Sequence, residues 1–227
     1  MLYIVSTPIG NLEDITLRAL RTLKEVDYIL CEDTRVAGKI LSHYEITSKL
    51  ISFHQHSSPE KLKYLVDLLR LGNSLALITD AGTPGVSDPG GKLIEEILKI
   101  DSDAKIVSIP GPSAITALVA VSGIPIDRFA FYGFLPNKNG RQKMLKEISA
   151  MQYPVIIYES KHRILKLLRE ISIIMPSAQI IIGRELTKMH ETIYRGSAEN
   201  ILKTLEDNKE EQKGEFVVII KNEKYDK

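Results

Sequence analysis

The chain has 227 residues, of which 44% are hydrophobic and 26% are charged, and its formal net charge is +1. This composition is that of an ordinary globular protein, and by itself it gives no argument for a nucleic-acid or membrane partner. The single cysteine, Cys31, excludes an intrachain disulfide and a zinc site made of thiolates, so we expect a cytoplasmic protein. The first residues lack the basic segment of a signal peptide, and no apolar run is long enough to span a membrane.

In the first half of the chain, short apolar segments alternate with amphipathic helical patterns. Near-continuous apolar strands that alternate with helices predict a mostly parallel sheet with helices on both faces, an α/β fold. The strands are expected at residues 2–6, 28–31, 50–53, 75–79 and 106–109, and the helices at residues 13–26, 36–44, 59–71, 91–100 and 113–121.

The pattern breaks at residues 122–127, where we place a boundary between a domain of residues 1–122 and a domain of residues 123–227. Successive strands in the second domain do not all have a helix of crossover length between them, which predicts a mixed α/β domain with a partly antiparallel sheet. The second domain holds 18 basic and 14 acidic residues, against 12 and 15 in the first, so it is the better candidate to face an anion. Its strands are expected at residues 129–134, 155–158, 179–183, 191–195 and 216–220, and its helices at residues 141–151, 163–174 and 198–205.

Four loops with unusual sequences follow predicted strands of the first domain. In an open parallel sheet, ligands bind at the carboxyl ends of the strands. The loop of residues 80–90 is rich in glycine and proline, which lets a ligand approach the backbone closely. Neither a G-x-G-x-x-G fingerprint nor a P-loop is present, which disfavours a nicotinamide dehydrogenase and a P-loop phosphotransferase. Each loop alone reads as a tight turn, but the four together favour a groove for a nucleoside-like ligand; they cover residues 7–11, 32–35, 80–90 and 110–114.

Five motifs give the chain a family resemblance: TPIGNLEDIT at residues 7–16, CEDTR at 31–35, DAGTP at 80–84, YESKHR at 158–163 and RELTK at 184–188. Together they closely resemble the ribosomal RNA small-subunit methyltransferase I family, and the resemblance covers almost the whole chain. Members of that family use S-adenosylmethionine to methylate the ribose 2′-hydroxyl of a cytidine in 16S rRNA. They have the tetrapyrrole methylase fold, which is two α/β domains with the cofactor in the cleft between them.

The resemblance also implies a cofactor site, a substrate and an oligomeric state. The substrate is 16S rRNA or the small ribosomal subunit, the protein is a homodimer, and no metal is required. Tetrapyrrole methylases usually carry a G-x-G-P-G-D loop after the first strand, whereas this chain reads TPIGN, which disfavours a porphyrin-like substrate. A tetrapyrrole C-methyltransferase and a non-catalytic module that binds nucleosides or RNA are the alternatives. The implied cofactor residues are Pro8, Asp80, Ala81, Gly82, Thr83, Val86, Ser113, Ala114, Glu159 and Leu186.

Methyl transfer to a ribose hydroxyl is helped by a group that removes or polarises the hydroxyl proton. Our hypothesis is that Glu32 or Asp33 plays this part, while Arg35 and Lys188 hold neighbouring phosphate or ribose oxygens. Asp33 is an equally good candidate to cap the helix that follows it, and the two roles are compatible. The alternative for Lys188 is a solvated lysine at the end of a strand.

Several other residues have both a functional and a structural interpretation. Tyr132, Phe134 and Tyr158 are candidates to stack on an RNA base or to be buried strand aromatics. His54 and His56 lack a third ligand for a metal and read as cleft or surface residues. Two basic sets could contact RNA, although a solvated helix face is the commoner meaning of such charges; they are Lys138, Arg141, Lys143 and Lys146, and Lys161, Arg163, Lys166 and Arg169.

Overall fold

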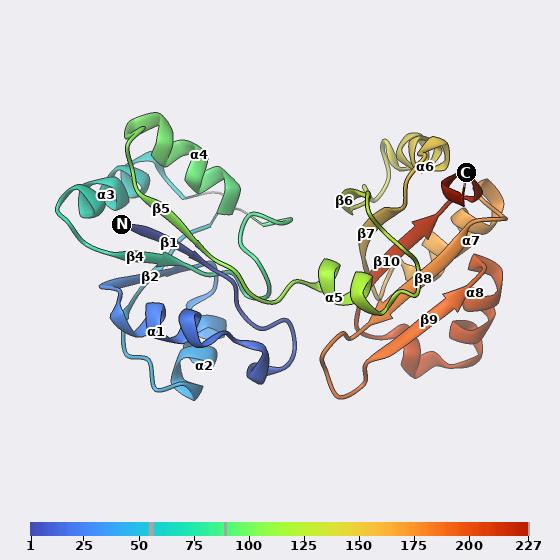
Figure 1. Cartoon of the computed structure of the whole chain (residues 1–227), viewed down its shortest axis with the longest axis horizontal. Coiled ribbons are helices and arrows are strands. Elements are labelled where there is room, and N and C mark those ends of the chain that lie inside the picture. Colours follow the sequence, from blue (N-terminus) through green and yellow to red (C-terminus); the bar gives the residue numbers. More distant parts are fainter. Residues whose placement is uncertain (55–56, 89, 227) are drawn as a thin grey trace. The chain divides into compact units, whose positions relative to one another are not determined.

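The computed structural model describes residues 1–54, 57–88 and 90–226, and most of its helices and strands are labelled in Figure 1. Contacts between Cα atoms divide the chain into two units, Met1–Ser113 and Ala114–Lys227. The helix α5 (Ala114–Val121) belongs by these contacts to the second unit, whereas the sequence pattern puts the boundary at the other end of this helix, after residue 122. Arg195 of the second unit helps to hold α5 there, because its guanidinium donates hydrogen bonds to the carbonyl oxygens of Val121 and Ser122 at the end of α5.

The first unit contains a five-stranded sheet in which every neighbouring pair of strands is parallel. This confirms the parallel sheet predicted from the apolar strands. The strand order is β3-β2-β4-β1-β5, so β4 lies at the centre, between β2 and β1. The strands are β1 (Leu2–Val5), β2 (Tyr28–Cys31), β3 (Lys49–Ser52), β4 (Leu75–Leu77) and β5 (Ile106–Ile109).

Side chains of the first sheet alternate between two apolar cores. Leu2 and Ile4 belong to a core with residues of α3 and α4, whereas Val5 belongs to a core with residues of α1 and α2. Because successive side chains of a strand point to opposite faces, both faces of this sheet are buried. Figure 1 shows α1 and α2 over one face and α3 and α4 over the other. These helices are α1 (Leu17–Glu25), α2 (Thr34–His43), α3 (Pro59–Arg70) and α4 (Gly90–Ile100).

The helix expected at residues 13–26 is two elements, so that prediction was wrong at its start. A 3-10 helix, η1 (Leu12–Asp14), precedes α1, and Ile15 and Thr16 between them are extended. The Thr16 side chain accepts a hydrogen bond from the main-chain N–H of Ala19, so Thr16 is the N-cap of α1. The apolar periodicity continues through this break and therefore does not reveal it.

The second unit contains a mixed sheet with the order β6-β7-β10-β8-β9. The pair β6 and β7 is parallel, and the other three pairs are antiparallel. This confirms the predicted mixed sheet. Its strands are β6 (Ala130–Phe134), β7 (Val155–Ser160), β8 (Gln179–Arg184), β9 (Thr192–Gly196) and β10 (Glu215–Lys221).

Three helices bury one face of the second sheet, and α5 packs on the other. Val155 and Ile157 of β7 lie in the apolar core with residues of α6, α7 and α8. A Cβ atom on Gly183 of β8 would lie 3.0 Å from a methyl group of Leu118, so α5 packs closely against the opposite face. The helices are α6 (Arg141–Ala150), α7 (Ile164–Ile174) and α8 (Ala198–Asp207), with short 3-10 helices η2 (Lys209–Gln212) and η3 (Glu223–Asp226). Within the described residues, no helix is both long and apolar enough to cross a membrane.

Candidate functional site

The loops after three parallel strands of the first unit border an open hollow of about 530 Å³. Because the strands are parallel, their carboxyl ends lie at one edge of the sheet, where ligands of such sheets bind. The hollow brings together three of the four residues predicted to be catalytic, and it adds Asp80 from the loop after β4. Its lining residues are Glu32, Asp33, Thr34, Arg35, Ser52, His54 and Asp80.

Ser52 was missed as a member of this site, whereas His54 was expected as a cleft or surface residue and lines the hollow. Ser52 ends β3 and His54 lies two residues beyond it, and the loop after β3 is not among the four loops singled out in the sequence. The same edge rule that applies to β2 and β4 applies to β3, so the signal was present. Gln55 and His56, from the same sequence motif, lie outside the described residues.

Asp33 is the N-cap of α2, as one of its two interpretations predicts. Its Oδ1 accepts a hydrogen bond of 2.8 Å from the main-chain N–H of Arg35. The Arg35 guanidinium also donates to both carboxylate oxygens, at 3.1 and 2.7 Å. The hydrogen bonds from the Arg35 side chain and then from its main chain lower the pKa of Asp33 to about 2. Asp33 is therefore a carboxylate that accepts protons poorly near neutral pH.

Glu32 differs from its neighbour in the surroundings of its carboxylate. Its side chain is exposed and lines the hollow. Among the described residues, none makes a hydrogen bond or an ion pair with the Glu32 carboxylate, whereas Asp33 is held by Arg35. Of the two acidic residues proposed to act on the ribose hydroxyl, Glu32 is thus the one that remains available.

Main-chain and hydroxyl hydrogen bonds tie together the loops after β1, β4 and β5. Thr7 and Gly82 exchange two main-chain hydrogen bonds, of 3.0 and 3.1 Å. The Thr83 hydroxyl lies 3.0 Å from the Ser6 hydroxyl and donates to the carbonyl oxygen of Pro112 at 3.2 Å. Three of the four predicted loops therefore form one connected surface, although the Thr83 hydroxyl itself is used to connect them.

The loop of residues 80–90 has a backbone that requires glycine. Gly82 and Gly85 have φ of 83° and 92°, a left-handed conformation that disfavours other residues. Asp88 Oδ1 accepts hydrogen bonds of 2.7 Å from the main-chain N–H groups of both Gly85 and Gly90, which closes the loop. A Cβ atom on Gly90 would lie 2.7 Å from the Gly85 nitrogen and 2.9 Å from Asp88 Oδ1. Pro89 of this loop lies outside the described residues.

The residues implied to bind the cofactor differ in how far their side chains are exposed. Ala81 is exposed, Val86 and Ser113 are partly exposed, and Pro8 is buried. Gly82 presents only backbone, as expected for a loop that a ligand approaches closely. Ser113 ends the first unit and Ala114 begins the second.

In the second unit, Glu159 lies at the centre of a buried ion network. Its carboxylate is fully buried and lies 2.6 Å from the Arg163 Nε and 3.4 Å from the Arg141 Nη1. Arg141 is also buried and contacts Glu170 at 2.7 Å. The Glu159 side chain also accepts a hydrogen bond from the main-chain N–H of Ser160. Its carboxylate is thus committed inside its own unit.

The loop after β8 holds Lys188 and the buried Leu186. Glu185 and Thr187 of this loop have positive φ, 50° and 67°, which is uncommon outside glycine and often found at functional sites. Lys188 Nζ donates to Glu185 Oε1 at 3.0 Å and to Glu215 Oε2 at 2.8 Å. Partial burial acts to lower the pKa of Lys188, but these two hydrogen bonds outweigh it, so the pKa is raised. Lys188 is a charged and paired lysine, not a freely solvated one.

Four of the eight basic residues considered for RNA contact have carboxylate partners. Arg141 and Arg163 belong to the buried network, Arg169 pairs with Glu206 at 2.6 Å, and Lys166 lies 4.0 Å from Glu170. Arg141 is only 2% exposed and cannot reach RNA from this position, which corrects its interpretation as a surface residue. The structure leaves Lys138, Lys143, Lys146 and Lys161 exposed.

Cys31 behaves as a structural residue. Cys31 is buried, and burial, with the nearby Asp80 and Asp33 charges, raises the pKa of its thiol to about 11, so it is an unreactive core thiol. Within the described residues, no group of three or more His, Cys, Asp or Glu side chains is placed to hold a metal ion.

Comparison with known proteins shows similarity along nearly the whole chain. The family described as "Tetrapyrrole (Corrin/Porphyrin) Methylases" matches residues 1–202. "Ribosomal RNA small subunit methyltransferase I" from Thermotoga maritima is 43% identical over 96% of this chain and 97% of its own length. The protein of the same name from Streptococcus pyogenes serotype M3 is 48% identical over 96% of this chain and 75% of its own length.

Solved structures agree on the fold. Diphthine synthase superposes with a TM-score of 0.71 at 15% identity, over 97% of this chain and 89% of its own. Uroporphyrin-III-C-methyltransferase from Thermus thermophilus superposes with a TM-score of 0.65 at 18% identity, over 99% and 95%. At such low identity these likenesses show a shared fold and nothing about the substrate.

Proposed function

This chain belongs to the tetrapyrrole methylase family, in its ribosomal RNA small subunit methyltransferase I branch, and from that membership we infer its reaction. It is an S-adenosylmethionine-dependent methyltransferase that acts on the ribose 2′-hydroxyl of a cytidine in 16S rRNA. The observation that carries this conclusion is that the similarity extends along nearly the whole chain and is not confined to a few motifs.

The loops of the first unit fit a cofactor that contains a nucleoside but no phosphate. The loop closed by Asp88 exposes Gly85, a glycine with positive φ, and the chain has no phosphate-binding fingerprint. S-adenosylmethionine, when bound, supplies a methyl group on a sulfonium sulfur. We propose that Ala81, Val86 and Ser113 offer side-chain contacts. The other residues are proposed to line the cofactor site, mainly through their backbone; they are Pro8, Asp80, Gly82, Thr83, Ala114, Glu159 and Leu186.

For the chemical step, we propose that Glu32 accepts the hydroxyl proton. The ribose 2′-oxygen forms a bond to the methyl carbon as the bond from that carbon to sulfur breaks, and the hydroxyl proton passes to a base. The Glu32 carboxylate is exposed and bound by none of the described residues, which suits this role, whereas the Asp33 carboxylate is held by Arg35 and its pKa of about 2 makes it a weak base. Asp33 would then orient Arg35, and Arg35 and Lys188 would hold phosphate or ribose oxygens.

Methyl incorporation into small ribosomal subunits tests the reaction. We expect labelled methyl groups to appear on a ribose 2′-oxygen, identified by mass spectrometry of the nucleosides, and no transfer to tetrapyrrole acceptors. Transfer to a tetrapyrrole, or cofactor binding with no transfer to any acceptor, would overturn the assignment.

Glu32→Gln should lower kcat by about a hundredfold or more with normal cofactor affinity, the loss typical of a missing general base. Full turnover of Glu32→Gln would show that another group takes the proton.

We also propose that the protein acts as a homodimer in the cytoplasm. Support for the compartment comes from the substrate, since small ribosomal subunits are found there, and the dimer rests on the family resemblance. Sedimentation velocity at micromolar concentration tests the dimer, and a single monomeric species across that range would contradict it.

A further inference from the structure

The strand β6 carries one extra residue that brings two aromatic rings to the same face of the second sheet. Phe131 pairs with Ile156 of β7 and Phe134 pairs with Tyr158, so three steps along β6 match two steps along β7. The register shift lies between Phe131 and Gly133, and Gly133 has a φ of 59°. In a regular strand, residues three apart point to opposite faces, but this β-bulge places Phe131 and Phe134 on one face.

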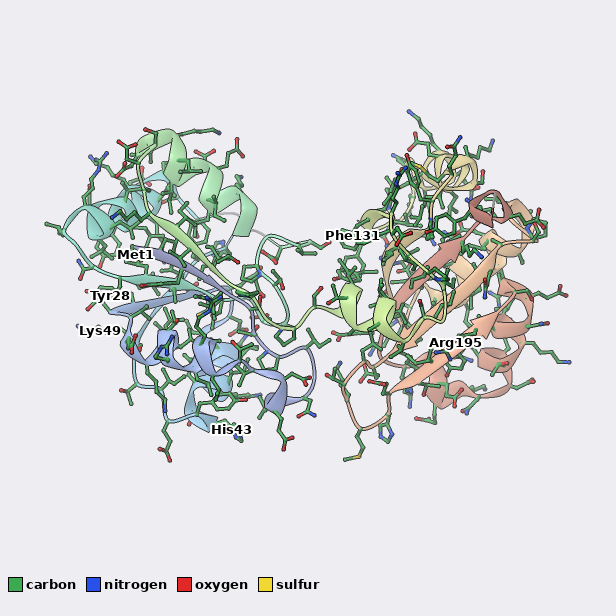
Figure 2. All side chains as sticks on the ribbon, viewed as in Figure 1. Met1, Tyr28, His43, Lys49, Phe131 and Arg195 are labelled. Carbon is green, nitrogen blue, oxygen red and sulfur yellow. The ribbon has the colours of Figure 1, made fainter. Side chains whose placement is uncertain are left out.

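The rings of Phe131 and Phe134 both contact Tyr158. Their ring centroids lie 5.0 and 5.5 Å from the Tyr158 centroid. Figure 2 shows the Phe131 side chain on β6. The face they occupy is the one opposite to α6, α7 and α8, because Val155 and Ile157 point into the core with those helices and Tyr158 does not. We call Phe131, Phe134, Tyr158 and Arg163 the aromatic cluster.

This cluster is open on its outer side and rigidly supported beneath. Phe134 is 54% exposed, which is uncommon for a large aromatic side chain in a sheet. The Arg163 guanidinium lies 5.9 Å from the Phe134 ring centroid. It is held there by the buried Glu159 carboxylate at 2.6 Å and by the carbonyl oxygen of Leu135 at 2.9 Å. The buried ion network thus fixes a cation beside an exposed ring.

The two loops that follow β6 and β7, next to the cluster, carry only basic charges. Since β6 and β7 are parallel, the loops that follow them emerge at the same edge of the sheet. Residues 128–146 contain five basic residues and no acidic ones, and residues 160–169 contain four basic residues and none that are acidic. Lys138 and Lys161, one in each loop, are both exposed. An exposed aromatic surface flanked by cations complements a polyanion that carries flat, apolar bases.

We propose that the aromatic cluster is a stacking site for an unpaired base of the 16S rRNA substrate, with Lys138 and Lys161 contacting the adjacent phosphates. Proteins that read single-stranded RNA stack its bases on aromatic side chains of a sheet face and on arginine planes. This inference rests on the proposed function for the identity of the RNA, and it assigns to the second unit a contact with the nucleic acid that lies outside the methyl-transfer step.

Phe134→Ala tests the site, with Phe134→Trp and Tyr153→Ala as matched controls. Tyr153 is an aromatic residue of the same unit with a similar exposure of 39%, but it precedes β7 and so lies at the opposite end of that strand. Binding is measured by fluorescence anisotropy with a labelled, unstructured, cytidine-rich oligoribonucleotide, and the KM is measured for small ribosomal subunits. We expect Phe134→Ala to weaken oligonucleotide binding about tenfold and to raise the KM for small ribosomal subunits about tenfold, the effect of losing one stacked base. The kcat and the affinity for S-adenosylmethionine should be unchanged. Phe134→Trp and Tyr153→Ala should bind as the wild type does.

Three results would overturn the inference. The first is unchanged oligonucleotide binding in Phe134→Ala, or no binding by the wild type. The second is a loss of S-adenosylmethionine affinity in the same variant, which would make the cluster part of the cofactor site. The third is a change of sedimentation coefficient, which would make it a contact between protein copies. If the wild type transfers no methyl group but Phe134→Ala still loses RNA binding, the stacking site stands and the proposed function falls.

Discussion

The two units of this protein hold their functional surfaces in place by different means. In the first unit, the loops at the sheet edge are tied by main-chain hydrogen bonds and small hydroxyl groups, such as those between Thr7 and Gly82 and between Ser6 and Thr83. In the second unit, a buried network of charged side chains around Glu159 supports the exposed residues above it. The first arrangement fixes loops to one another largely through their backbone, and the second holds charged side chains in position.

The largest effect should come from breaking the buried network. Glu159→Ala would leave Arg141, which is 2% exposed, without one of its two carboxylate partners. Removing one partner of a buried ion pair typically costs about 3–5 kcal/mol. Because Arg141 keeps its 2.7 Å contact with Glu170, we expect a loss at the lower end of this range. We expect the free energy of unfolding, measured by urea denaturation and circular dichroism, to fall by about that amount.

Glu206→Ala is the matched control for this change. Glu206 pairs with Arg169 at 2.6 Å, but both side chains are about half exposed, so the pair is screened by solvent. A much smaller change in the free energy of unfolding is expected. Equal losses in the free energy of unfolding would show that the buried ion network stabilises the protein no more than an exposed ion pair does.

A methyl group added to the glycine loop should weaken cofactor binding. In Gly90→Ala, the new Cβ atom would lie 2.7 Å from the Gly85 nitrogen and would disturb the two hydrogen bonds to Asp88. Overpacking of this kind typically costs about 1–3 kcal/mol, or roughly five- to a hundredfold in affinity. Titration calorimetry with S-adenosylmethionine measures the effect. Gly91→Ala is the control, because a Cβ atom there has nothing within 4 Å, and equal affinity in the two variants would separate the loop from the cofactor.

Removing the Thr83 hydroxyl tests the hydrogen bonds between the loops. Thr83→Val keeps the shape of the side chain but loses the contacts with the Ser6 hydroxyl and the Pro112 carbonyl. The expected loss in the free energy of unfolding is about 1 kcal/mol for each hydrogen bond. Thr83→Ser should recover most of it, and a fully stable Thr83→Val would mean that the main-chain hydrogen bonds suffice.

The smallest effect concerns Asp33 and depends on pH. Because the pKa of Asp33 is lowered to about 2 in the folded protein, its stabilising contribution is complete above about pH 4 and is lost as the pH falls towards 2. Asp33→Asn should therefore lower stability slightly at neutral pH and leave it unchanged relative to the wild type near pH 2. The pKa can be read directly from the Asp33 carboxyl resonance in an NMR titration. A value near 4 would show that Arg35 does not hold the carboxylate in solution.

The fold was predictable where the apolar pattern is local. The expected strands at residues 28–31 and 106–109 match β2 and β5 in full, because each is a short, largely apolar run that begins after a charged residue and ends before Glu32 or Pro110. The start of α1 was not predictable from periodicity, since it depends on the capping bond from Thr16 to Ala19. The parallel and mixed sheets both followed from whether a helix lies between successive strands.

The site of the first unit was more predictable than that of the second, because its residues are placed by the local sequence. Glu32 and Asp33 immediately follow β2, and Asp80 comes three residues after the end of β4, so the edge rule for parallel sheets brings them together. Arg141 reads as one basic residue among several, and its burial depends on Glu159 and Glu170, which are 18 and 29 positions away. No local pattern marks such a pairing.

The bulge in β6 makes the aromatic surface depend on the number of residues in a strand. Without the bulge, the three-residue spacing would turn one of the two rings to the other face of the sheet while leaving every side chain chemically unchanged. Deleting one residue between Phe131 and Phe134 would instead restore a regular strand with both rings on one face. In an alignment of related chains, the aromatics should therefore be three residues apart where the bulge is present and two apart where it is absent.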